Sequence, residues 1–311
     1  MPNRKKDVLL ANGFTSSTHS HPIAALDPAT NKLPNDLNVL IIGASRGIGA
    51  GIACAYAQAG TANLILAARA SSLKELASVG QKARDLAPSV PITCLTVDIT
   101  SSESVRNLAR EFKEKFCRLD ILVLNSGYSG PVVLKVDEGD PQDFKDVFDV
   151  NVQGTYLVAH HFLPLLKESG GAKTFIAVNS FAALITSGHI ANTAYCVSKL
   201  AQARLVEYMA EQYGNEGLLA IAVHPGAVLT GMAAQTAPES MMPYLTDDAG
   251  LCGAFCVWLS HEKKMWLNGR LISATWDVNE LSEKRDQIES EDLLKVGFRV
   301  GDASAASLRQ P

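Results

Sequence analysis

Tyr195 and Lys199 stand four residues apart in a stretch with a helical pattern, so both side chains leave the same helix face, one turn apart. A free phenol has a pKa of about 10 and is a poor proton donor or acceptor near neutral pH. An ammonium group within roughly 4–6 Å favours the phenolate and lowers that pKa. The pair can therefore perform acid/base chemistry. Taken alone, such a pair is common on helix surfaces and usually has no catalytic role.

A glycine-rich turn lies well upstream of this pair. The apolar run Asn38 to Ile42 ends at Gly43-Ala44-Ser45-Arg46-Gly47-Ile48-Gly49, and Ala50 to Ala59 then has a helical pattern. Glycines allow positive φ angles and the close approach of a pyrophosphate, which backbone N–H groups and a helix N-terminus can hold. The spacing G-x-x-x-G-x-G differs from the usual G-x-G-x-x-G dinucleotide pattern. The turn nevertheless lies in the strand–turn–helix context that such a site requires.

Alternating apolar and helical segments continue along the chain and predict an α/β fold with a doubly wound parallel sheet. Continuous Val/Ile/Leu runs are typical of parallel strands that helices cover on both faces. The further predicted strands are Asn63 to Ala67, Ile92 to Val97, Leu119 to Leu124, Thr174 to Val178, Leu218 to Val223 and Arg270 to Ala274. The further predicted helices are Leu73 to Leu86, Ser102 to Phe116, Asp143 to Lys167, Tyr195 to Tyr213 and Asp248 to Leu259.

Length and composition limit the classes of function. A chain of 311 residues suits one large α/β domain, and a net charge of −4 gives no reason to expect a nucleic-acid or membrane partner. The six cysteines are scattered without metal-ligand spacing, so no metal site is expected. Because no apolar run approaches the roughly 20 residues of a membrane span, a cytoplasmic location is expected.

With these motifs in register, the chain resembles the short-chain dehydrogenase/reductase family in its single-domain, Rossmann-like form, over roughly residues 39–279. The resemblance rests on the glycine-rich turn, Asp98 after the third strand, Asn125-Ser126-Gly127 after the fourth, Asn151, Ser180 after the fifth, Tyr195 with Lys199, and Pro225-Gly226 with Thr230. All of these occur in the family's order and approximate spacing.

The resemblance implies a catalytic role for four residues. Tyr195 would exchange a proton with the substrate oxygen, while Lys199 would lower the Tyr195 pKa and bind the nicotinamide ribose. Ser180 would bond the reacting oxygen, and Asn151 would hold a water that links Lys199 to solvent. The interval from Ser180 to Tyr195 is about two residues longer than is usual in the family, so Ser187 is the fallback for the catalytic serine.

The resemblance also implies a nicotinamide cofactor and the residues that bind it. These residues are Gly43, Ser45, Arg46, Gly47, Ile48, Gly49, Arg69, Asp98, Ile99, Asn125, Ser126, Gly127, Pro225, Gly226, Val228 and Thr230, together with Tyr195 and Lys199. Asp98 would contact the adenine, although it could also cap the helix that follows. Ala68 stands where an acidic residue would select NAD, and the Arg69 and Arg46 guanidinium groups suit a 2′-phosphate, so NADP(H) is expected.

The chain is expected to divide into an N-terminal arm (residues 1–37) and a catalytic domain (38–311). The domain would include a substrate lid at about 231–248 and a C-terminal extension at about 280–311. The stretches His21 to Leu26 and Ser273 to Leu281 are similar to family members from filamentous fungi, which favours specialised metabolism.

The expected activity is NADPH-dependent interconversion of a carbonyl and an alcohol on a small, largely apolar molecule. The alternatives are a non-redox enzyme, such as a cyclase or dehydratase, and a catalytically silent NADP(H)-binding regulatory protein. The long helices at 143–167 and 195–213 resemble the family's subunit interface, so a homodimer or homotetramer is expected.

Overall fold

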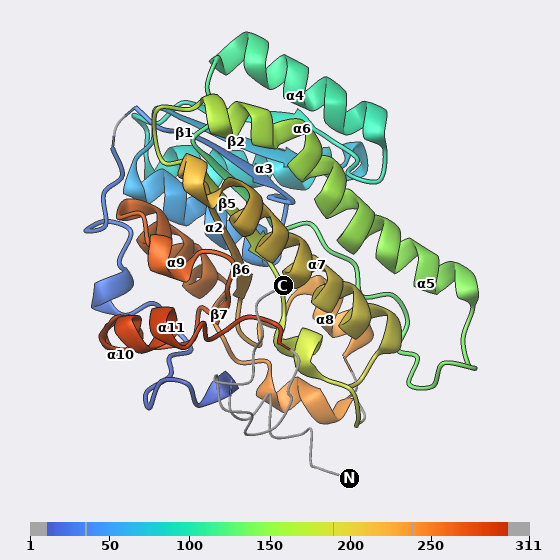
Figure 1. Cartoon of the computed structure of the whole chain (residues 1–311). Coiled ribbons are helices and arrows are strands. Elements are labelled where there is room, and N and C mark those ends of the chain that lie inside the picture. The colour runs from blue at the N-terminus through green and yellow to red at the C-terminus, as the bar shows by residue number, and fades with distance from the viewer. Residues whose placement is uncertain (1–10, 35, 189, 238, 298–311) are drawn as a thin grey trace, which may run out of the picture.

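The computed structural model describes residues 11–34, 36–188, 190–237 and 239–297 (Figure 1). Within them, seven parallel strands form one sheet in the order β3-β2-β1-β4-β5-β6-β7. The predicted strands and the doubly wound fold class are confirmed. The strands are β1 (Asn38–Ile42), β2 (Asn63–Ala68), β3 (Ile92–Thr96), β4 (Ile121–Leu124), β5 (Thr174–Val178), β6 (Leu219–His224) and β7 (Leu271–Ser273).

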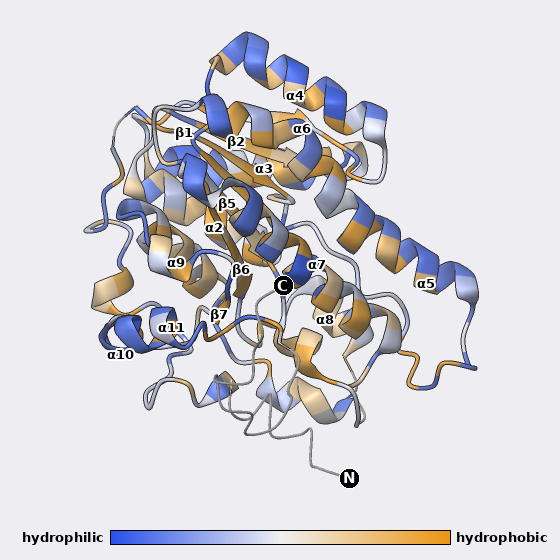
Figure 2. Cartoon of the chain, viewed as in Figure 1, coloured by the Kyte–Doolittle hydropathy of each residue, from blue (hydrophilic) through white to orange (hydrophobic). Residues whose placement is uncertain are grey.

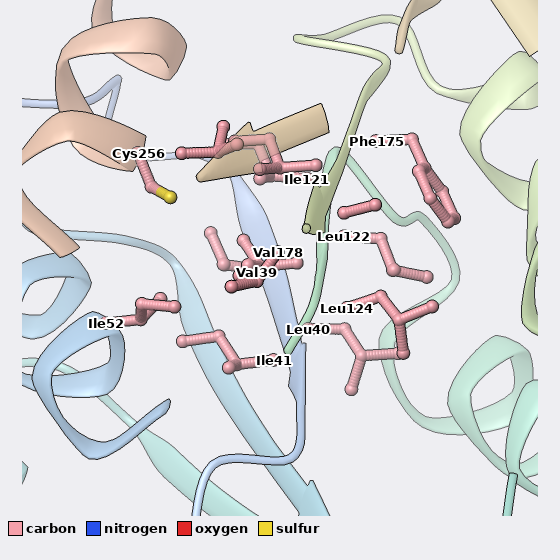
Figure 3. Packing of buried hydrophobic residues seen from close by; sticks show 14 of the residues in the cluster. Val39, Leu40, Ile41, Ile52, Ile121, Leu122, Leu124, Phe175, Val178 and Cys256 are labelled. Carbon is pink, nitrogen blue, oxygen red and sulfur yellow. The ribbon is translucent and has the colours of Figure 1, made fainter. Parts of the chain in front are cut away.

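The central strands are mostly apolar because helices cover both faces of the sheet, and the buried polar residues Asn38 and Thr174 stand at the first positions of β1 and β5. Every residue of β1, β4 and β5 is buried, and Figure 2 shows these strands as hydrophobic ribbons between more polar helices. Figure 3 shows Ile41 of β1 close to Ile52 of α2. The register places Ile41 between Leu66 of β2 and Val123 of β4, so β1 lies in the middle of the hydrophobic core.

Helices lie in two layers on the sheet (Figure 1). On one face, α2 (Gly47–Ala59) packs between α3 (Leu73–Leu86) and α9 (Ala249–His261). The other face carries α4 (Ser102–Phe116), α5 (Pro141–Phe148), α6 (Gly154–Glu168) and α7 (Thr193–Tyr213). Shorter helices follow at α8 (Gly231–Thr236), α10 (Val278–Glu283) and α11 (Arg285–Ser290).

The helix predicted over residues 143–167 is interrupted. A π-helical turn, Asp149–Gln153, separates α5 from α6 and contains the buried Asn151. Such turns occur often at functional sites, where an extra residue re-aims side chains without ending the helix. Hydrophobic periodicity does not reveal this insertion because the apolar stripe continues on both sides of it.

The segment 231–248 lacks a clear period in the sequence but contains local helical structure. Thr230 begins α8 by accepting a hydrogen bond from the Ala233 N–H (3.1 Å), and a 3₁₀ turn, Glu239–Tyr244, follows. Six-residue elements are too short to produce a recognisable hydrophobic period. Leu229, Met232 and Tyr244 keep exposed side chains in this region.

The N-terminal segment 11–34 packs against the C-terminal part of the chain (Figure 1). The Trp276 indole donates a hydrogen bond to the Ala11 carbonyl (2.8 Å), and its ring lies 5.0 Å from that of Phe14. The His19 ring lies 2.9 Å from the Asp277 carboxylate. The N-terminal region and the 273–281 stretch therefore contact each other directly.

The division of the chain at residue 37 stays a prediction, as does the assignment of an arm. Leu26 and Leu33 are nonetheless buried in the main core. In the predicted C-terminal extension, Leu281 and Ile288 are also fully buried. The remaining parts of both predicted segments, residues 1–10, 35 and 298–311, lie outside the described residues.

Trp276→Ala should destabilise the protein by about 3–5 kcal/mol, because it removes a fully buried indole and the hydrogen bond to the N-terminal segment. Urea unfolding followed by circular dichroism measures the change. Tyr244→Ala is the matched control, since that ring is 73% exposed and should cost less than about 0.5 kcal/mol. Equal losses for the two variants would contradict the assigned packing.

Candidate active site

The glycines in the turn between β1 and α2 leave space beside the backbone for a bulky anion. Gly43 and Gly47 have positive φ angles of +89° and +54°. A Cβ at Gly49 would lie 2.0 Å from the Gly43 carbonyl oxygen. The first N–H groups of α2 face outward from this turn, with the positive end of the helix dipole behind them. These features fit the pyrophosphate of a dinucleotide.

The loops after β4 and β6 converge on the same turn. Asn125 donates a side-chain hydrogen bond to the Gly43 carbonyl (2.8 Å), and the Asn125 and Ser126 N–H groups bond to the last residue of β1. A Cβ at Gly47 would lie 3.2 Å from the Thr230 methyl. A Cβ at Gly127 would lie 3.6 Å from the Lys199 ammonium nitrogen. The fold thus brings the glycine turn and the catalytic candidates to one edge of the sheet.

The other predicted cofactor residues differ in their exposure to solvent. Arg46 and Arg69 are exposed, with Arg69 at the end of β2. Asp98 accepts hydrogen bonds from the N–H and hydroxyl of Thr100, whereas Ser101 caps α4. Asp98 therefore forms the turn before the helix and is not the cap itself. Ser45, Ile99, Pro225, Gly226 and Val228 are buried, and Ile48 is half-buried.

Tyr195 and Lys199 lie in the first turns of α7, with the ammonium nitrogen 5.8 Å from the phenol ring centre. Burial raises the pKa of Tyr195 to about 12, while a hydrogen bond with Ser180 acts in the opposite direction. Burial lowers the pKa of Lys199 to about 7. In the free protein desolvation dominates both groups, so the net shift of the Tyr195 pKa is upward, and the lowering of that pKa by Lys199 stays a prediction.

Ser180 follows β5 and lies beside Tyr195. Its hydroxyl oxygen accepts from the Ala182 N–H (3.1 Å) at the start of a 3₁₀ turn, Phe181–Leu184. Its influence on the pKa of Tyr195 indicates that it lies near the phenol. The fallback Ser187 is exposed in the connecting loop. The geometry thus favours Ser180 over Ser187, although the catalytic roles themselves stay predictions.

Asn151 is fully buried and joins the π-helical turn to α7 and to the loop after β4. Its side-chain oxygen accepts from the Tyr128 N–H (2.9 Å), and its amide donates to the Tyr128 carbonyl and the Ser198 hydroxyl. The Asn151 carbonyl accepts a hydrogen bond from the Thr155 hydroxyl (2.7 Å). Asn151 therefore fixes the loop that faces Lys199. The proposed water on Asn151 stays a prediction.

Sequence reasoning missed two neighbours of Lys199. Gln202 accepts a hydrogen bond from the Lys199 ammonium through its side-chain oxygen (3.0 Å). Asn179 donates to that same oxygen and to the Lys199 carbonyl, each at 3.0 Å. The i, i+3 spacing of Lys199 and Gln202 was the available signal for the first contact. The contact with Asn179 depends on tertiary structure.

Two cavities border the predicted site. One, of about 470 Å³, is lined by Ser45, Arg46, Gly47, Ala50, Lys74, Glu75, Ser78, Val79 and Lys82, beside the glycine turn. The other, of about 290 Å³, lies between the loop that precedes α5 and the start of α7, with Val133, Phe144 and Val147 in its lining.

In the described ranges, no cluster of three or more His, Cys, Asp or Glu could hold a metal. No helix in these ranges is long and apolar enough to cross a membrane.

The Lys199 ammonium should titrate in the free protein with a midpoint near pH 7, well below the usual lysine value of 10.5. Its burial favours the neutral amine, so the charged form is lost as the pH rises through 7. Nuclear magnetic resonance of protein carrying ¹³C-labelled lysine measures the midpoint, with Lys199→Met to identify the signal. A midpoint near 10.5 would contradict the buried placement.

Comparisons with known proteins agree with this geometry. The family model described as short chain dehydrogenase matches residues 37–240. The short chain dehydrogenase pgmD of Aspergillus terreus is 38% identical over 298 residues, which are 92% of this chain and 94% of the relative. For the short chain dehydrogenase citE of Monascus ruber the identity is 39% over 287 residues, 91% of this chain and 96% of the relative.

A similar solved structure is a short chain dehydrogenase from Shigella flexneri in complex with NADP. It superimposes with a TM-score of 0.70 at 27% identity, over 79% of this chain and 99% of the other. The family match over residues 37–240 and the similarity over nine-tenths of the chain lead to one conclusion: the protein belongs to the short-chain dehydrogenase family.

Proposed function

We propose that the protein is an NADP(H)-dependent oxidoreductase that interconverts a carbonyl and an alcohol on a small, largely apolar molecule. The observation that carries the proposal is the convergence of Tyr195, Lys199 and Ser180 beside a glycine turn that fits a pyrophosphate. A protein that only bound the nucleotide would need the turn but not a serine beside a half-buried tyrosine.

In this proposal the nicotinamide, when bound, supplies or accepts the hydride, and the chain's own residues handle the proton. The phenol of Tyr195 is protonated in the free protein because burial holds its pKa near 12. It can therefore donate a proton to a carbonyl oxygen. Ser180 can donate a second hydrogen bond to the same oxygen, where negative charge develops in the transition state.

The NADP(H) preference rests on the charges near the glycine turn. Ala68, at the end of β2, carries no carboxylate to repel a 2′-phosphate, and the exposed Arg69 follows it. The charged residues in the lining of the adjoining 470 Å³ cavity are three cations, Arg46, Lys74 and Lys82, and one carboxylate, Glu75. A phosphate dianion is favoured by such a cationic surface. The NADP in the Shigella flexneri structure is consistent with this preference.

The class of substrate is inferred from the segment after β6. Met232 and Met242 are partly exposed, and the nearby Tyr244 is 73% exposed. Flexible methionine side chains adapt to irregular apolar shapes. We infer that this segment acts as a lid over an apolar substrate. The similarity to short chain dehydrogenases of Aspergillus and Monascus supports a role in specialised metabolism.

A homodimer or homotetramer is part of the proposal. Tyr156 on α6 and Val197, Leu200 and Tyr208 on α7 expose large apolar side chains. A partner subunit could cover this surface. The cytoplasmic location also stays a prediction.

Purified protein should oxidise NADPH when it is offered a suitable ketone from a chemically diverse panel. Absorbance of the reduced nicotinamide follows the reaction, and mass spectrometry identifies the alcohol. Product without any change in the nicotinamide band would instead identify a non-redox enzyme. Tight NADPH binding without product across a broad panel would favour the regulatory alternative.

NADPH should bind more tightly than NADH by one to two decades, because charge-assisted hydrogen bonds to a phosphate contribute about 1.5–3 kcal/mol. Arg69→Ala should weaken NADPH and leave NADH nearly unchanged. Ala68→Asp should invert the preference by repelling the 2′-phosphate. Quenching of tryptophan fluorescence measures both affinities, and equal wild-type affinities would refute the NADPH assignment.

A further inference from the structure

The ammonium of Lys199 is held among neutral oxygens. The residue is 3% exposed, and its nitrogen donates to the Val178 carbonyl and the Gln202 side-chain oxygen, both at 3.0 Å. Among the described residues, no carboxylate forms an ion pair with Lys199. A buried ammonium without a counter-charge depends on the dipoles around it for its charge and its position.

Gln202 is the centre of a buried side-chain network that connects three elements. It is fully buried on α7, and its amide oxygen accepts from both Lys199 and Asn179, the residue that follows β5. Its amide nitrogen donates to the Thr155 hydroxyl on α6 (2.9 Å). Thr155 in turn donates to the Asn151 carbonyl. These bonds fix the orientation of the Gln202 amide, because the oxygen faces two donors while the nitrogen faces an acceptor.

We propose that Gln202 is a positioning residue for Lys199, whose amide oxygen, oriented by Asn179 and Thr155, holds the lysine side chain as a charged group beside Tyr195. An ammonium has three N–H donors. Val178 and Gln202 take two of them, which leaves the third for the nicotinamide ribose or for the water expected on Asn151. The inference rests on the proposed Tyr195–Lys199 chemistry, but the network itself is a property of the free protein.

The charges around the lysine determine how the proposal is tested. The titratable side chain near the ammonium is Tyr195, on the same helix. The neighbouring elements contribute the Val178 carbonyl and the Asn151 amide near the ammonium, and neither carries a charge. A change of the acceptor at residue 202 should therefore shift the pKa of Lys199 directly.

The test is the titration of ¹³C-labelled Lys199 in the full-length free protein. Gln202→Met keeps the length of the side chain and removes the acceptor, so the midpoint should fall by about one pH unit. Gln202→Glu supplies a charged acceptor, so the midpoint should rise. Thr155→Val leaves the lysine contact in place but removes the partner that orients the amide. It should lower the midpoint by less than Gln202→Met does.

Ser260→Ala is the matched control, because it removes a buried hydroxyl that bonds to Tyr56 on the opposite face of the sheet. Its lysine midpoint should be that of the wild type. If Gln202→Met does not fold, Gln202→Glu and Thr155→Val still decide the question. Unchanged midpoints, or shifts of the same sign in the Met and Glu variants, would overturn the proposal.

The same samples separate this inference from the proposed function. The titration uses no nucleotide, so the predicted order of midpoints supports the network whether or not NADPH is oxidised. In an active enzyme, Gln202→Met should lower kcat at saturating NADPH at least tenfold, and Gln202→Glu should recover part of the loss. A purely structural role would reduce the amount of folded protein without this recovery.

Discussion

The site depends on one electrostatic constraint: an ammonium group must remain beside a phenol in a region that is almost closed to water. Burial disfavours the charge on Lys199 and lowers its pKa to about 7, and burial raises that of Tyr195 to about 12. The oxygens of Val178 and Gln202 oppose the first effect. The protein therefore keeps the phenol protonated and leaves the lysine close to the point where it changes charge.

The sheet supplies the rigidity that this constraint needs. Parallel strands end at a common edge, so the glycine turn after β1, the loop after β4 and Ser180 after β5 are neighbours in space. The buried residues of the central strands are mostly apolar, which leaves little freedom for any of these strands to slip. Side chains from α7, α6 and the end of β5 then form the polar network around Lys199.

Much of the fold could be predicted from local patterns. The apolar runs that became β1 and β5 were correctly assigned because continuous Val/Ile/Leu segments bounded by turn residues are typical of covered parallel strands. The π-helical turn at Asp149–Gln153 was missed, since one inserted residue does not disturb the apolar stripe. The contact of Trp276 with Ala11 was also missed, because it joins residues at opposite ends of the chain.

The candidate site, too, could be predicted from the sequence only in part. Tyr195, Lys199 and the glycine turn follow from residue types and spacing, and the structure brings them together. The upward shift of the Tyr195 pKa in the free protein could not be predicted, because sequence spacing gives the distance to Lys199 but not the depth of burial. The roles of Gln202 and Asn179 depend on which way an amide faces, and only tertiary contacts determine that.

The central claim is that the phenol of Tyr195 is the proton donor, and Tyr195→Phe tests it most directly. The variant keeps the ring next to Lys199 and removes only the hydroxyl group. Under saturating NADPH with an accepted ketone, turnover should fall by about 10²–10⁴-fold while the NADPH affinity stays within about twofold of wild type. A variant that retained more than about a tenth of the wild-type rate would contradict the account.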